Sequence, residues 1–353
     1  TVLVPDQSYR EGQGNQAIKR SNLVVQRSSI PVIAGSGRSG TTWVLDVLAE
    51  ANGLRPVFEP LYPGANPVAE RYHSRYLEPS QNEPQLRDYL TRIFERREMN
   101  SFSDYRISPT SLRLDRKKFE SVRAFRKYVS TLKTLHRRRS QFGPALRRDK
   151  AIVKFIRANW LLPWILNHFE AAAVLMVRHP AAVVDSQLRN IEHWDPDARL
   201  LRLLESEYVR ESYRHELDRI DSRRLSTFGR LVTIWCIENA VPVKMSQSFG
   251  YSTVFYEHLK DDYPQSWRRL ADALRLTEIP QESSILRPSQ QSSLRWQQKN
   301  GIGGQVDPAA WRRRLGATEE SEFEYILELF DIDYYEWGSD RPSGFGRLEP
   351  ADG

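Results

Sequence analysis

The 353-residue chain has one cysteine, Cys236, three methionines and no hydrophobic run long enough to cross a bilayer. A single cysteine excludes an internal disulfide framework and any zinc site built from several cysteines. The seven histidines lack the spacing of metal ligands, so no metal is expected. The first residues show no signal-peptide pattern, and we predict a cytoplasmic protein. Peripheral contact with a membrane, and removal of a leader or anchor before Thr1, both stay open.

Acidic residues are scarce between residues 113 and 150, where 14 Lys and Arg accompany three acidic side chains and the net charge is +11. The whole chain carries +7, so the remainder is acidic. Apolar residues recur there at three- and four-residue intervals and predict an amphipathic helix. Its basic face is either simply solvated or a docking surface for an anionic polysaccharide or membrane head groups. Nucleic-acid binding is not expected, because no recognition motif accompanies the charge.

Short apolar segments rich in β-branched residues alternate with helical patterns along the chain. This alternation predicts an α/β fold in which helices cover both faces of a central parallel sheet. Residues 1–29 are polar and predict a loosely held arm, and residues 30–353 predict one domain with helical insertions at about 60–150. The expected strands are 31–34, 151–154, 173–177 and 252–256, and the expected helices are 41–52, 85–98, 112–139, 159–169, 180–189, 199–220 and 225–248.

Residues 31–43 read Pro-Val-Ile-Ala-Gly-Ser-Gly-Arg-Ser-Gly-Thr-Thr-Trp, an apolar strand that enters a helix through a glycine-rich turn. Such a turn aims backbone N–H groups and the positive end of the helix dipole at one point, which suits a phosphate. The spacing from Gly35 to Gly40 is close to that of a P-loop, but Thr41 stands where a nucleotide triphosphatase has Lys. A loop without that Lys, and with Arg38 inside it, fits a ligand whose 5′ chain is not a triphosphate.

A second segment, residues 173–189, combines an apolar strand, Arg178, a proline suited to the start of a helix, and Ser186 about two helical turns later. The helical spacing returns Ser186 to the side near the strand end. An arginine and a hydroxyl that meet there could bind a second phosphate. Taken alone, the segment also fits a buried strand that ends in a solvated arginine.

The sequence Arg-Ser-Gly-Thr-Thr-Trp at 38–43 resembles the 5′-phosphosulfate loop of the sulfotransferases, which transfer a sulfuryl group from 3′-phosphoadenosine 5′-phosphosulfate (PAPS) to an acceptor. Arg before Ser-Gly-Thr-Thr is similar to the carbohydrate and tyrosylprotein branches, and the single cysteine favours a bacterial member. The resemblance implies a P-loop-like three-layer fold, and it implies that Arg178 and Ser186 bind the 3′-phosphate. The loop residues that it assigns to PAPS are Gly37, Arg38, Ser39, Gly40, Thr41, Thr42 and Trp43, the last against adenine unless it is simply a core residue.

Glu59 lies in the sequence Val-Phe-Glu-Pro-Leu just after the first expected helix, and we expect it near the carboxyl end of the sheet beside the loop. Phe-Glu-Pro-Leu resembles the carbohydrate sulfotransferases at the same distance from the loop, which implies that Glu59 is the general base. The alternative is that Glu59 orients Arg38 or a helix end. Arg38 is the expected group that neutralises the leaving phosphate.

Lys154 ends the second expected strand and matches the lysine of the Lys-Thr-His motif of the cytosolic branch, but Ile156 stands where that motif has histidine. A histidine-based mechanism is therefore not expected. Lys154 either helps to neutralise the sulfuryl or phosphate oxygens or is a plain surface lysine. In this scheme Arg and Lys neutralise the phosphates without a metal.

Two further stretches resemble the family less sharply. Residues 254–259 are similar to a strand end whose Tyr256 would lie near the adenosine. Residues 296–315 resemble the C-terminal loop that closes on the 3′-phosphate, which would assign Lys299 and Gly301 to the nucleotide. A mobile surface loop is the equal alternative for this last stretch.

The motifs together predict a sulfotransferase that uses PAPS, releases 3′,5′-ADP and acts on a hydroxyl of a carbohydrate, glycolipid or polysaccharide, with an anionic glycan among the candidates. One alternative is a small-molecule or nucleoside kinase with a P-loop fold, although its loop would lack the central lysine. The other is a nucleotide- or polyanion-binding protein without catalysis. The sequence does not indicate an oligomeric state.

Overall fold

The computed structural model describes residues 29–63, 66–97, 129, 148–189, 191, 195–221, 224–286 and 309–343. These residues build a parallel five-stranded sheet with the order β2-β3-β1-β4-β5. The register places Val32 of β1 between Val153 of β3 and Ala173 of β4. The strands are β1 (Ile30–Gly35), β2 (Arg55–Val57), β3 (Ala151–Phe155), β4 (Ala171–Val177) and β5 (Ser252–Phe255). The prediction of an α/β fold with a central parallel sheet is confirmed.

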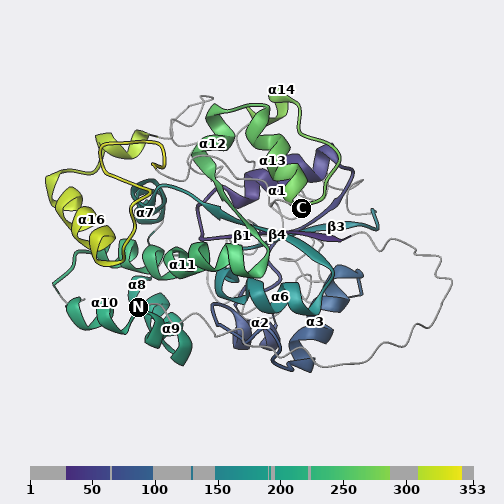
Figure 1. Ribbon diagram of the computed structural model, residues 1–353, viewed down its shortest axis with the longest axis horizontal. Helices are drawn as coiled ribbons and strands as arrows, with labels where there is room; N and C mark the ends of the chain where they lie inside the picture. The colour runs from purple at the N-terminus through teal and green to yellow at the C-terminus, as the bar shows by residue number, and fades with distance from the viewer. Residues whose placement is uncertain are drawn as a thin grey trace, which may run out of the picture.

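Helices cover both faces of the sheet (Figure 1), because the central strands are apolar on both sides. Val32 and Ala34 of β1 belong to one buried cluster, whereas Ile33 between them belongs to the other. One face packs against α1 (Thr41–Ala51), α12 (Tyr256–Asp261) and α13 (Gln265–Ala273). The other face packs against α3 (Pro84–Phe94), η3 (Asn159–Leu161), α6 (Leu162–His168), α7 (Pro180–Leu188), α11 (Thr227–Phe249) and α16 (Ala317–Leu329).

The expected helix over 199–220 is wrong as a single element. The chain there forms α8 (Pro196–Leu204), α9 (Glu207–Ser212) and α10 (Arg214–Arg219). Ser206 is extended at the start of α9, and Tyr213 between α9 and α10 donates its hydroxyl to the carbonyl of Ile237 in α11 at 3.2 Å. Packing against α11 therefore divides a segment whose apolar periodicity suggested one helix.

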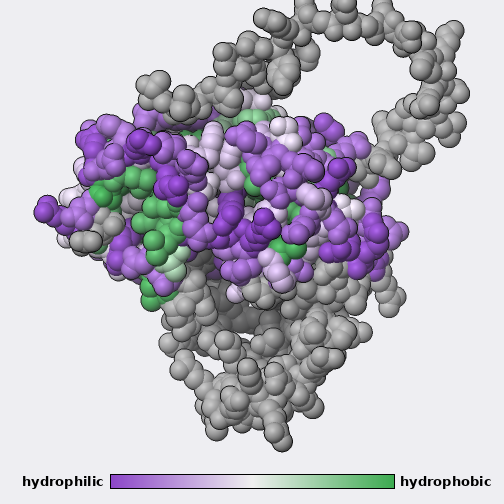
Figure 2. Space-filling model, turned by 90° about the horizontal axis from the view of Figure 1, so that it is seen from below, coloured by the Kyte–Doolittle hydropathy of each residue, from purple (hydrophilic) through white to green (hydrophobic). Residues whose placement is uncertain are grey.

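Short elements complete the described chain: α2 (Pro67–Tyr72), α14 (Glu282–Ile285) and η5 (Ala310–Arg313). Within the described part of the expected insertion at 60–150 the structure is helical, with α2 and α3. The expected helix 112–139, nearly all of the arm 1–29 and most of the loop 296–315 lie outside the described residues. None of the described helices is both long enough and apolar enough to cross a membrane. Figure 2 shows a largely hydrophilic surface with an apolar area on the side of α8–α10.

Candidate functional site

The turn between β1 and α1 is built on left-handed backbone at Arg38, with φ of 80°, and at Gly40, with φ of 86°. A Cβ at Gly40 would lie 2.4 Å from Cδ2 of Tyr256, so this position requires glycine for both its conformation and its space. A non-glycine residue in this conformation is strained, and such strain persists where the surroundings impose it. The first amides of α1 have no carbonyl partner in the helix and face the turn. The backbone therefore has the form that the sequence predicts for a phosphate loop.

Residues from three distant segments meet at one end of this loop. Nε of Arg38 donates to Oγ of Ser186 at 2.8 Å, and Nη1 of Arg178 donates to the carbonyl of Arg38 at 3.2 Å. The Arg178 guanidinium also lies 4.5 Å from the centroid of the Tyr256 ring. Gln187 donates to the carbonyl of Gly37 at 3.1 Å, which ties α7 to the loop. The structure thus brings together the loop, the arginine–serine pair and the tyrosine that the sequence singled out.

Positive charge accumulates at this end of the loop. Burial, together with the nearby positive charges of Arg178 and Arg189, lowers the pKa of Arg38 to about 10. Asp185 is a buried carboxylate of the cluster, and it accepts hydrogen bonds from Nε and Nη2 of Arg314 at 2.7 and 2.6 Å. Arg189 lies 3.3 Å from the same carboxylate. Arg189 and Arg314 pair with Asp185, and the buried Glu257 interacts with Arg178. Four guanidinium groups against two carboxylates leave an excess of positive charge that suits a multiply charged anion.

Two polar atoms at the loop end have no hydrogen-bond partner among the described residues. Oγ of Ser39 and Nε of Arg178 are buried, and neither has a hydrogen-bond partner within the described part of the chain. Buried polar atoms are normally satisfied, so an unpaired hydroxyl and an unpaired guanidinium N–H indicate a missing acceptor. The residues present therefore fit a phosphorylated ligand.

A buried ion pair occupies the other end of the loop. Nζ of Lys154 lies 2.9 Å from Oε1 of Glu59 and donates to Oγ1 of Thr42 at 3.1 Å. Arg157 approaches the second carboxylate oxygen of Glu59 at 3.5 Å. The Lys154 and Glu59 side chains are each 2% exposed. Burial lowers the pKa of Lys154, and the charge of Glu59 opposes this effect.

This geometry decides the alternative for Lys154 and shows the partners of Glu59. Lys154 is not a surface lysine, because β3 ends at Phe155 and carries its side chain into the buried pair. Glu59 lies beside the loop, as predicted, and within the described residues it pairs with Lys154 and Arg157 rather than with Arg38. Arg157 is a functional candidate that the sequence reasoning missed. It stands three residues after Lys154, but no sequence pattern links it to a carboxylate 98 residues away.

Trp43 lies in the core at the start of α1, where 5% of it is exposed. Its Nε1 donates to the carbonyl of Ile285 at 3.2 Å, and its ring packs edge-on against Tyr256 and Trp267. Nζ of Lys260 lies 4.6 Å from the ring centroid. Trp43 therefore holds α12 and α13 against α1, which is the core role that the sequence left open.

The turn between β4 and α7 is held by the C-terminal segment. The buried ring of His179, next to Arg178, stacks on Trp311 at 4.8 Å and on Phe323 at 5.5 Å. Its backbone N–H donates to Glu257 at 2.9 Å. Burial lowers the pKa of His179 to about 4, so the ring is neutral at physiological pH. This aromatic stack fixes the position of Arg178 at the strand end.

Lys299 and Gly301 lie outside the described residues, so their expected contact with the nucleotide stays a prediction. The motif Trp-Arg-Arg-Arg-Leu near them does reach the site, through Arg314. The sequence could not show which of its three arginines would do so. In the parts of the chain that the structure describes, no group of three or more His, Cys, Asp or Glu side chains could hold a metal ion.

No protein-family model matches the chain, and no curated protein matches it. Among solved structures, the chain is similar to sulfotransferases. The sulfotransferase domain of the Synechococcus PCC 7002 olefin synthase is 17% identical at a TM-score of 0.42, over 90% of this chain and 99% of that domain. The sulfotransferase domain of the curacin biosynthetic pathway is 15% identical at a TM-score of 0.38, over 86% of this chain and 98% of that domain. A sulfotransferase from Mycobacterium avium is 14% identical at a TM-score of 0.34, over 86% of this chain and 78% of that chain.

Proposed function

We propose that the chain is a sulfotransferase that moves a sulfuryl group from PAPS to an acceptor hydroxyl. The observation that carries the proposal is that one phosphate loop has two different groups of charged residues at its two ends. Arg38, Arg178 and Ser186 converge on one end, and Lys154 with Glu59 occupies the other. A nucleotide phosphorylated at both ends of its ribose can place one phosphate at the arginine end and the other on the loop beside Lys154, which donates to Thr42.

The loop from Gly37 to Thr42 would hold the 5′-phosphosulfate, and Arg178 with Ser186 would hold the 3′-phosphate. In the transfer, the acceptor oxygen forms a bond to sulfur while the bond from sulfur to the 5′-phosphate oxygen breaks, and 3′,5′-ADP leaves. Glu59 accepts the proton of the acceptor hydroxyl. Lys154, already in contact with Thr42 of the loop, balances the charge that grows on the leaving phosphate.

A kinase with this fold is the weaker candidate. Its P-loop lysine would reach the β- and γ-phosphates, whereas here Thr41 takes that position and Lys154 approaches from β3, held by Glu59. A binding protein without catalysis would have no need of a buried carboxylate beside the loop. For the acceptor we propose a hydroxyl of a carbohydrate, glycolipid or polysaccharide. Contact of the basic segment 113–150 with a membrane or an anionic glycan stays a proposal, because most of it lies outside the described residues.

Calorimetry with three nucleotides tests the donor. We expect 3′,5′-ADP to bind the full chain more tightly than 5′-AMP or ATP with Mg²⁺. Arg178→Ala and Ser186→Ala should each lose that preference, by about tenfold or more, since a charge-assisted hydrogen bond to phosphate disappears. Arg214→Ala is the matched control, because this arginine is paired on the surface with Glu211. Tighter binding of ATP with Mg²⁺ would refute the sulfotransferase proposal.

Turnover with radiolabelled PAPS, offered to an extract of glycans, lipids and metabolites, tests Glu59. Glu59→Gln should keep 3′,5′-ADP binding, which also shows that the variant is folded, and lose about 10²- to 10⁴-fold in transfer rate because the general base is gone. Unchanged transfer would remove Glu59 from this role while leaving the donor assignment intact.

A further inference from the structure

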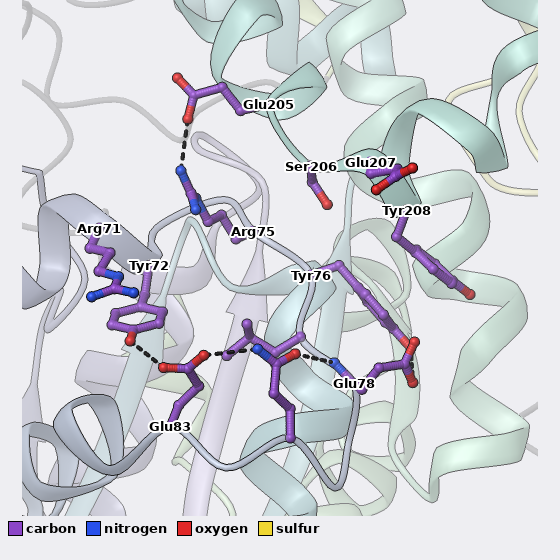
Figure 3. Close-up of a pocket in the computed structure, with 12 residues that line it drawn as sticks. Arg71, Tyr72, Arg75, Tyr76, Glu78, Glu83, Glu205, Ser206, Glu207 and Tyr208 are labelled. Carbon is purple, nitrogen blue, oxygen red and sulfur yellow. Dashed lines mark hydrogen bonds and ion pairs between the residues drawn. The ribbon is translucent and has the colours of Figure 1, made fainter.

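A cavity of about 480 Å³ opens between the turn that follows α2 and the junction of α8 with α9 (Figure 3). This volume is within the range of small-ligand pockets. Arg71 and Tyr72 line one side, and Tyr76 with Tyr208 lines the other (Figure 3). We refer to it as the tyrosine pocket. Neither the sequence motifs nor the nucleotide site accounts for it.

One wall of the tyrosine pocket is aromatic. The rings of Tyr76 and Tyr208 stack with their centroids 3.8 Å apart and their planes 13° from parallel. Tyr72 donates its hydroxyl to Glu83, and Tyr76 donates to Glu78 at 3.2 Å. Burial raises the pKa of Tyr72 to about 12 and also raises the pKa values of Tyr76 and Tyr208. The phenols therefore stay protonated, polar at the tip and apolar on their faces.

The charge of the tyrosine pocket opposes an anionic ligand. Its lining holds four glutamates and two arginines, a net charge of −2. Arg75 is already paired with Glu205 at 3.0 Å. Ser206 lies beside Glu207, and Arg71 lies across the pocket next to Tyr72, so donors and acceptors are both present in the lining (Figure 3). An anion would use only the donors and a cation only the acceptors, whereas an uncharged polyhydroxylated molecule uses both and also has C–H groups that can pack against the partly exposed Tyr208.

Described contacts connect the tyrosine pocket to the Glu59 end of the nucleotide loop. The N–H of Ser74 donates to the carbonyl of Arg157 at 2.7 Å, and the Arg157 guanidinium approaches Glu59 at 3.5 Å. Ser74 has left-handed backbone with φ of 58°, and the next two residues, Arg75 and Tyr76, line the pocket. The backbone that builds this wall therefore lies against the residue that holds the expected general base.

We infer that the tyrosine pocket binds an uncharged sugar unit, and that this unit is part of the acceptor. The second half of the inference rests on the proposed function, whereas the first half does not. It departs from the sequence expectation that an anionic glycan is among the candidates, because the lining carries net negative charge.

An array of immobilised oligosaccharides, in which each neutral glycan is paired with its uronic-acid or sulfated counterpart, tests the inference on the full chain. We expect neutral glycans to bind more tightly than their acidic counterparts. Tyr208→Ala should weaken that binding by about tenfold or more, because the stacked wall is lost, and Arg71→Ala should weaken it through loss of a donor. Tyr325→Ala is the matched control, since this tyrosine is 45% exposed on α16.

Calorimetry with 3′,5′-ADP on the same proteins verifies that each variant is folded and tests the donor site separately. Absence of binding to every neutral glycan, a preference for the acidic partners, or binding unaffected by both pocket variants would overturn the inference. The chain could instead bind a glycan through Tyr208 but fail to bind 3′,5′-ADP. That result would overturn the proposed function and the role of the sugar as acceptor, but it would leave the sugar site in place.

Discussion

The buried pair of Lys154 and Glu59 makes a quantitative prediction about stability. Glu59→Gln removes the charge 2.9 Å from the Lys154 ammonium but keeps the shape of the side chain. Lys154 is then left buried beside the like charge of Arg157, with Asp46 as the remaining nearby acid. Breaking a buried pair from one side costs about 3–5 kcal/mol, because the other charge stays desolvated. We expect Glu59→Gln to lower the free energy of unfolding by about this amount.

Lys154→Met should cost less, about 1–3 kcal/mol, because Glu59 keeps Arg157 at 3.5 Å as a counter-charge. In the double variant no buried ammonium remains, so its cost should fall short of the sum of the single costs by about 2 kcal/mol. The assay is urea unfolding of the four proteins at pH 7, followed by circular dichroism and extrapolated linearly. Additive costs, or a Glu59→Gln cost below about 1 kcal/mol, typical of an exposed pair, would refute the reasoning.

Three further predictions concern the loop, the histidine and the carboxylate beside it. Gly40→Ala should weaken 3′,5′-ADP binding by more than about tenfold in calorimetry, because of its left-handed φ and the adjoining tyrosine ring, whereas Gly53→Ala, also left-handed but with open space around it, should not. Because the pKa of His179 is lowered to about 4, the stability that its neutral form contributes is complete above its ordinary value near 6.5 and is lost as pH falls from there to about 4. The loss is on the order of 3 kcal/mol, and His179→Phe should flatten the unfolding free energy across that interval. Asp185→Asn should reduce 3′,5′-ADP affinity by about tenfold, since Ser186 and the arginines lose their anchor, while Asp340→Asn, which breaks a surface pair, should leave the affinity unchanged.

Most of the sheet could be predicted from local pattern, because four of its strands are short apolar runs with β-branched residues. β2 could not. It has three residues, and it contains Pro56 and the buried Arg55, whose guanidinium donates to the carbonyls of Ile93 and Phe94. A proline is tolerated there because β2 is an edge strand. A buried charge satisfied by a remote helix leaves no local signature.

The residues of the candidate site also include some that the sequence could predict and some that it could not. The loop, Arg178 and Ser186 could be found because their spacing within one strand-turn-helix unit determines where they lie. The roles of Arg157 and Arg314 could not, since each pairs with a carboxylate that is remote in the sequence. The tyrosine pocket joins residues 71–83 to 205–208, and no periodicity in either segment indicates the other.

Asp185 of α7 pairs with Arg314, which lies 129 residues later in the sequence. Gln187, on the same helix, donates to Gly37 of the phosphate loop, which lies 150 residues earlier. The nucleotide site is thus assembled from the beginning, middle and end of the described chain. A bound nucleotide would act as a non-covalent cross-link between these three parts. At a concentration about 100-fold above its Kd it would add about 2.7 kcal/mol to the stability of the whole fold rather than to one segment. Nucleotide binding should therefore raise the melting temperature of a single cooperative unfolding transition. A thermal-shift measurement would identify the donor before any acceptor is known.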